Sequence, residues 1–102
     1  MTRKGYIVAE VKSDRPEALA AYRAASTAAV SQYGGRFLVR GGDAEVLEGP
    51  WSPPQRLVVL EFDSVDQARR FYHSPEYQAA RSLRDGLAEM NMLAIPGVDN
   101  QV

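Results

Sequence analysis

Charged side chains interrupt three otherwise apolar stretches of this 102-residue chain, and they are its best candidates for chemistry. They are Glu10 in GYIVAEV, Arg36 and Arg40 in RFLVR, and Glu61 in RLVVLEF. An arginine offers a planar fork that fits a carboxylate or enolate oxygen, whereas a glutamate can move a proton. The pattern therefore allows a site in which Arg40 or Arg36 binds an anionic substrate and Glu61 or Glu10 transfers the proton.

Aromatic and imidazole side chains supply further candidates. His73, the only histidine, lies beside an expected helix break and is either a proton carrier or an exposed residue. Tyr77, like Tyr22 and Tyr72, could donate a hydrogen bond from its hydroxyl to a substrate. Packing at the edge of the core explains tyrosines at these positions equally well. Trp51 lies among three prolines and could cover a pocket, clamp a partner subunit or cover its own core edge.

Composition excludes several classes of site. The absence of cysteine rules out disulfides, thiolate catalysis and cysteine-ligated metals, and a single histidine rules out paired-histidine motifs. We therefore expect neither a metal nor an organic cofactor. The 12 Lys and Arg nearly balance the 13 Asp and Glu, which argues against a nucleic-acid or membrane partner. No apolar run at the N-terminus resembles a signal peptide, so we expect a cytoplasmic protein.

Hydrophobic periodicity predicts one domain over residues 1–102, with its core at about 5–97. The expected elements are a strand at 5–11, a helix at 16–33, strands at 36–40 and 56–62, a helical region from 64 that breaks near 73–74, and a strand at 88–95. The glycine pair 34–35 should end the first helix, since glycine accepts a positive φ. The pair 41–42 permits a bulge or tight turn, after which apolar residues 46–47 allow the strand to resume.

This element order predicts an α+β, ferredoxin-like βαββαβ fold with a four-stranded antiparallel sheet and both helices on one face. The strands, however, are apolar on both faces. The face expected to meet the helices carries Ile7, Val11, Phe37, Val39, Val58, Leu60 and Phe62. The other face carries Tyr6, Val8, Leu38, Leu57 and Val59, together with Glu10, Arg36, Arg40 and Glu61. An open apolar face of this size favours a homodimer packed sheet to sheet.

If the second and third strands pair regularly with Leu38 opposite Val59, then Arg36 lies opposite Glu61 and Arg40 opposite Leu57. A structural explanation then competes with the site: an Arg36–Glu61 ion pair, with Arg40 bonded to backbone or to Glu48. Dimerisation would desolvate these charges, so they must either pair or bind a polar ligand.

Several strings carry a resemblance to a known family. They are YGGRFLVRGG at 33–42, VLEG at 46–49, FYHSPEY at 71–77 and the helix start at 16–18. Over about residues 5–97 the chain resembles a bacterial domain-of-unknown-function family of the dimeric α/β-barrel superfamily, with Arg15 departing from the aspartate usual before the proline. The resemblance implies the fold and the homodimer. Relatives in that superfamily include cofactor-independent quinol or polyketide monooxygenases, haem-degrading enzymes and muconolactone-type isomerases.

Two functions remain open. One is a cofactor-independent monooxygenase or isomerase that takes a small aromatic or acidic molecule into a pocket between sheet and helices. The other is a non-catalytic dimeric binding or stress-response module. An RNA-recognition module shares the topology but needs stacking aromatics on the third strand, which RLVVLEF lacks.

Overall fold

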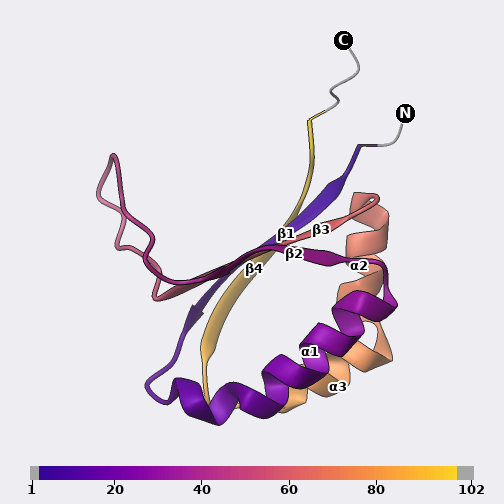
Figure 1. Cartoon of the computed structure of the whole chain (residues 1–102), viewed down its shortest axis with the longest axis horizontal. Helices are drawn as coiled ribbons and strands as arrows, with labels where there is room; N and C mark the ends of the chain where they lie inside the picture. The colour runs from indigo at the N-terminus through magenta and orange to yellow at the C-terminus, as the bar shows by residue number, and fades with distance from the viewer. Residues whose placement is uncertain (1–2, 99–102) are drawn as a thin grey trace.

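Helices cover one face of the sheet in the computed structural model, which describes residues 3–98 (Figure 1). The elements are β1 (Gly5–Lys12), the 3-10 helix η1 (Pro16–Leu19), α1 (Ala20–Gln32), β2 (Arg36–Gly41), β3 (Arg56–Phe62), α2 (Val65–His73), α3 (Pro75–Ser82) and β4 (Glu89–Pro96). The strands form one sheet in the order β2-β3-β1-β4, and every neighbouring pair is antiparallel. The predicted ferredoxin-like βαββαβ fold is confirmed.

Short polar and glycine signals set the helix ends. Gly34 has a φ of +78°, and the N–H of Gly35 donates to the Val30 carbonyl at 2.9 Å, which closes the last turn of α1. The Ser64 hydroxyl accepts a hydrogen bond from a backbone N–H in the first turn of α2, at 3.0 Å. Ser74 does the same for α3, also at 3.0 Å, and it directly follows the last residue of α2. The expected break between two helices is thus confirmed.

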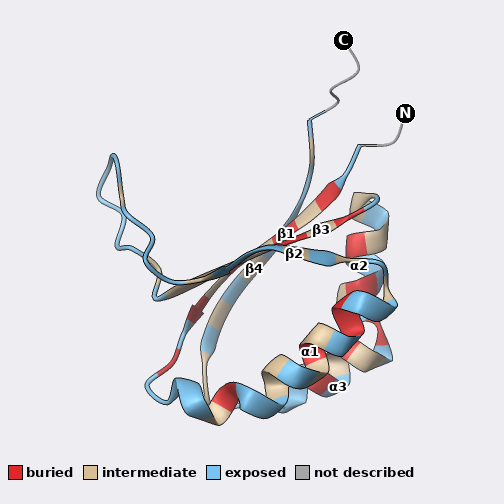
Figure 2. Cartoon of the chain, viewed as in Figure 1, coloured by how far each residue is buried: buried red, intermediate tan, exposed pale blue. Residues whose placement is uncertain are grey.

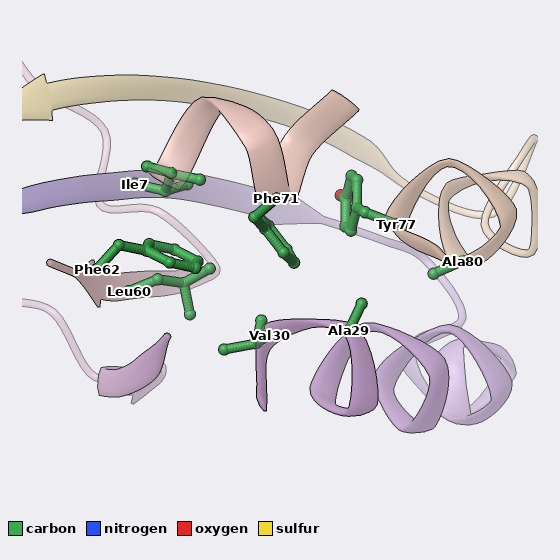
Figure 3. Packing of buried hydrophobic residues seen from close by; sticks show 9 residues of the cluster. Ile7, Ala29, Val30, Leu60, Phe62, Phe71, Tyr77 and Ala80 are labelled. Atoms are coloured by element: carbon green, nitrogen blue, oxygen red, sulfur yellow. The ribbon is translucent and has the colours of Figure 1, made fainter. Parts of the chain in front are cut away.

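The core lies between the inner face of the sheet and the helix layer (Figure 2). Its centre is an aromatic stack in which Phe71 contacts Phe62 on one side and Tyr77 on the other (Figure 3). The ring centroids are 5.2 Å and 4.8 Å apart, and each of the three residues is at most 1% exposed. Each such burial contributes roughly 1.5–3 kcal/mol of transfer free energy, so this stack fixes α2 and α3 firmly on the sheet.

The register between β2 and β3 corrects the regular pairing expected from the sequence. Phe37 lies opposite Leu60, but Val39 lies opposite Val59, so Leu38 is an extra residue in a β-bulge. A bulge of one residue shifts the two-residue alternation of the strand by one step. Side chains that follow Leu38 therefore point to the opposite face from the one predicted.

Two expectations fail for this reason. Arg40 lies opposite Val58, not Leu57, and therefore faces the helices and not the open side of the sheet. Val39 was expected on the helix side, yet it lies on the outer face, where it is 44% exposed. The Arg36–Glu61 pairing precedes the bulge, and that prediction is confirmed.

A long arm, residues 42–55, joins β2 to β3. Figure 1 shows that it extends past the end of the sheet and bends away from the helices. Residues 46–47 do not resume the strand, which is a further correction. Leu47 is 88% and Trp51 is 61% exposed, so Trp51 does not cover the core edge of its own chain.

Candidate functional site

A cavity of about 60 Å³ lies between α1 and the inner face of the sheet. It exists because α1, AAYRAASTAAVSQ, is built largely from alanine and serine, which cannot fill the space beneath it. The helix packs mainly on α3 and makes few contacts with the strands. Apolar residues from both layers dominate the lining, among them Leu19, Val30, Phe37, Leu60 and Met92.

Three arginines contribute the charged part of the lining: Arg23, Arg40 and Arg56. Arg40 Nη2 donates a hydrogen bond to the Thr27 hydroxyl at 2.8 Å. Its guanidinium carbon lies 4.0 Å from the ring centroid of Phe37, a cation–π distance. Among the described residues, no carboxylate and no imidazole lines this cavity, so its charge is positive.

A pair of tyrosines supplies the hydroxyl groups of the cavity. The Tyr22 and Tyr77 hydroxyl oxygens are 2.8 Å apart and share a hydrogen bond. The Tyr22 hydroxyl also donates to the Met90 sulfur at 3.9 Å. Burial, with the neighbouring Tyr77 as a lesser cause, raises the pKa of Tyr22 far above its ordinary value. Tyr22 therefore stays protonated at neutral pH, so its hydroxyl can donate a hydrogen bond but cannot act as a base.

Arg36 and Glu61 come together on the other face of the sheet. Arg36 Nε donates to Glu61 Oε1 at 2.7 Å, and Arg36 Nη2 contacts the same oxygen. The Tyr6 hydroxyl donates to Glu61 Oε2 at 3.0 Å. These hydrogen bonds lower the pKa of Glu61, and the hydrogen bond from Arg36 is the larger cause. Glu61 is thus held as a carboxylate with both oxygens engaged, and the sheet separates it from the cavity.

The structure places the remaining sequence candidates apart from one another. Glu10 is half-buried opposite Leu57 on the outer face. His73 is exposed at the end of α2, with its ring 5.2 Å from that of Tyr72. Trp51 lies on the arm between β2 and β3. Of the seven predicted site residues, only Arg40 and Tyr77 line the cavity.

Sequence reasoning missed two charged residues of the cavity. Arg56 begins β3 two positions before Val58, so strand alternation alone would have placed it on the inner face. Arg23 lies four positions after Leu19 and three before Ser26, on the stripe of α1 that faces the sheet. Both signals are present in the sequence, although neither residue is among the candidates predicted from it.

Two further features are absent from residues 3–98. No three His, Asp or Glu side chains in this range come close enough together to hold a metal ion. None of the helices in this range is both long and apolar enough to span a membrane.

Comparison with protein families gives one match. The model of DUF1330, described as a domain of unknown function, matches residues 4–98. No curated protein matches the chain.

Solved structures show the same fold at low sequence identity. A protein of unknown function from Rhodopseudomonas palustris has a TM-score of 0.72 at 20% identity, covering 97% of this chain and 85% of its own. SnoaB, a cofactor-independent oxygenase from Streptomyces nogalater, has a TM-score of 0.67 at 12% identity and 98% coverage of both chains. A dimeric protein of unknown function and ferredoxin-like fold from Bacteroides fragilis has a TM-score of 0.56 at 16% identity, covering 91% of this chain and 94% of its own.

Proposed function

This chain belongs to the DUF1330 family, and from that premise we propose that it binds a small aromatic acid or enol, as its anion, in the cavity beneath α1. The observation that carries the proposal is the lining itself. Apolar side chains would surround an aromatic ring, arginines supply positive charge, and the hydroxyls of Tyr22 and Tyr77 supply hydrogen-bonding groups. Pockets that recognise small ligands commonly combine an apolar wall with a few polar groups in this way.

The arginines favour an anion over a neutral ring. Arg23, Arg40 and Arg56 contribute three positive charges, and no carboxylate among the described lining residues compensates them. An arginine fork binds a carboxylate or enolate through two parallel hydrogen bonds. The aliphatic and aromatic lining would exclude water from the rest of the ligand, which strengthens that interaction.

The chemistry that suits this cavity starts from a substrate that is already ionised. The described lining contains no carboxylate or imidazole that could act as a general base, and burial keeps Tyr22 protonated. An electron-rich enolate can itself reduce O₂: a ring CH₂ becomes a carbonyl, one oxygen atom enters the product and the other leaves as water. The similarity to SnoaB, a cofactor-independent oxygenase, supports this monooxygenase activity. An isomerase would need a base, which the described lining lacks.

A homodimer is the second part of the proposal. The outer face carries exposed apolar residues on its two edge strands, namely Leu38, Val39, Leu93 and Ile95. Soluble monomers rarely leave a large contiguous apolar face in water. The dimeric, ferredoxin-like neighbour from Bacteroides fragilis supports a second copy as its cover. The exposed arm that carries Trp51 would then contact the partner.

Binding without turnover is the alternative, as in a stress-response or carrier module. The 2.8 Å hydrogen bond between Tyr22 and Tyr77 favours this alternative, because it engages the two hydroxyls with each other. Oxygen uptake separates the two functions. Under the monooxygenase proposal, the protein consumes O₂ when an anthrone or a dihydroxynaphthalene is added, and equimolar binding without O₂ uptake would establish the alternative.

The binding proposal is tested with a charged and a neutral ligand of the same shape. Benzoate and naphthoate should raise the melting temperature, whereas benzamide and naphthamide should not. Arg56→Gln should weaken the binding of benzoate and naphthoate. Arg15→Gln is the matched control, because Arg15 is exposed and does not line the cavity. Equal stabilisation by acid and amide would overturn the proposal.

A further inference from the structure

A second hollow, of about 460 Å³, lies between α2, α3 and the edge strand β4. Its charged lining consists of Arg69 from α2, Arg81 from α3 and Arg84 from the turn that follows, and His73 from α2 also lines it. No carboxylate of the described residues lines it. In a chain whose net charge is only −1, these three arginines form a local excess of positive charge. We refer to this hollow as the basic groove.

Three of these side chains have no anionic partner within residues 3–98: His73, Arg81 and Arg84 form no ion pair there. Arg69 pairs with Asp66 at 2.8 Å, but both side chains are more than half exposed, and such pairs are weak. Nothing in the described chain therefore neutralises the groove.

Arg84 gives the groove a second, independent feature. Its Nε is buried and has no hydrogen-bond partner, and it is the one side-chain polar atom of the described residues in that condition. Its guanidinium carbon lies 5.5 Å from the ring centroid of Tyr22, so the head group is held against the aromatic layer. A buried donor without a partner is costly, and buried polar groups are nearly always hydrogen-bonded. The head group of Arg84 is thus held in place at the groove and does not extend freely into solvent.

We propose that the basic groove binds a small organic dianion, a phosphate monoester or a dicarboxylate, with its apolar part against Met92 and Ala94. Several guanidinium groups around one position match the oxygens of a dianion, whereas a single carboxylate would leave most of the charge unpaired. The apolar residues of β4 in the lining favour a ligand that carries a hydrocarbon part over a bare inorganic ion.

The basic groove adjoins the cavity beneath α1, with which it shares Ile7, Met90 and Met92, but the arginines of the two sites differ. None of the three arginines of the groove lines the cavity, and none of the cavity's three arginines lines the groove. The groove also lies on the helix side of the sheet, so a sheet-to-sheet dimer would leave it open to solvent. The inference therefore does not depend on the proposed function or on the assembly.

The experiment measures dissociation constants and amide chemical shifts for four probes: phenyl phosphate, phthalate, benzoate and inorganic phosphate. Phenyl phosphate or phthalate should bind at least about tenfold more tightly than benzoate or inorganic phosphate, and raised salt should weaken it. Shifted amides should lie in α2, α3 and β4. A preference for phenyl phosphate identifies a phosphate ligand, and a preference for phthalate identifies a dicarboxylate. Shifts confined to α1 and β2 would overturn the proposal, because they would place the dianion in the cavity.

Variants provide the matched comparison. Arg81→Gln should raise the dissociation constant of the preferred dianion about tenfold, which is the loss of affinity expected for one charge-assisted hydrogen bond. Arg70→Gln is the control, since Arg70 is also an exposed arginine of the helix layer but does not line the groove. Arg81 is exposed, so its replacement should leave the fold intact. Equal affinities for the wild type and both variants would refute the groove as the binding site.

Discussion

The guanidinium of Arg40 donates a hydrogen bond from Nη2 to the Thr27 hydroxyl at 2.8 Å, which links β2 to α1 beside the cavity. The same helix also places Ala29 and Val30 in the hydrophobic core cluster that contains Leu60 of β3. Arg40 thus has two properties at once: it lines the cavity, and it ties the two layers that form it.

Replacement of Arg40 by lysine should separate these two properties. Arg40→Lys retains the positive charge but loses the planar guanidinium group that can bind a carboxylate through two hydrogen bonds. Stabilisation by benzoate should therefore disappear. The free protein should change by at most about 1 kcal/mol, because Arg40 is exposed and its hydrogen bond is a single one. Thr27→Val removes only the partner hydroxyl and should keep the benzoate response. Melting curves with and without benzoate give both answers, and a full response in Arg40→Lys would exclude Arg40 from the site.

The tyrosine pair should show strong coupling in unfolding experiments. Tyr22→Phe or Tyr77→Phe alone leaves one buried hydroxyl without its partner and should cost about 1–3 kcal/mol. The double variant removes both hydroxyls, so its cost should fall clearly below the sum of the single costs. Denaturant titration of the four proteins measures this. Simple additivity would show that the 2.8 Å hydrogen bond contributes little to stability.

Glu61 should contribute to the acid sensitivity of the fold. The hydrogen bonds from Arg36 and Tyr6 lower its pKa in the folded protein below the ordinary value of 4.5. The unfolded chain then binds the proton more readily, so this stabilisation is present above pH 4.5 and is lost as the pH falls through the folded pKa.

The corresponding experiment follows the melting temperature between neutral pH and pH 3. Glu61→Gln should be less stable than the wild type at neutral pH and should lose less stability on acidification. Glu48→Gln, which removes an exposed carboxylate from the arm, should follow the wild-type profile. Parallel profiles for the wild type and Glu61→Gln would contradict the assignment.

A charge on the outer face should separate the proposed dimer. Val39 is 44% exposed in the single chain, so Val39→Asp should cost the fold itself no more than about 1 kcal/mol. Placed against a second sheet, the same carboxylate would be buried without a partner. Light scattering should give about twice the 11.2 kDa chain mass for the wild type and the single mass for the variant. Leu83→Asp, an exposed residue on the helix side, should remain dimeric, and a monomeric wild type would refute the dimer.

Local signals allowed most of the fold to be predicted from the sequence. The signals at the helix ends act within one helical turn, namely Ser64, Ser74 and the glycine pair 34–35. Their effect can therefore be inferred from the residues that neighbour them in the sequence. Two-residue alternation likewise placed Arg36 opposite Glu61. The site was less predictable because it depends on how α1 lies over the sheet. No local pattern sets the space that its small side chains leave.

The main failure has a single physical cause. A bulge had been allowed for at the glycine pair 41–42, but it lies at Leu38, a residue with no special backbone preference. Pairing with β3 decides its position, and that pairing is a long-range property. One misplaced residue was enough to assign Arg40 to the wrong face of the sheet.

The bulge at Leu38 also bears on how relatives of this chain should be aligned. A homologue that keeps every letter of RFLVRGG but pairs this strand without the bulge would have its second arginine on the open face, which leaves the cavity without that charge. Two chains could then share the same sequence motif and differ in the ligand that they bind. Whether this strand is paired with or without the bulge therefore decides whether a binding residue can be transferred from one family member to another.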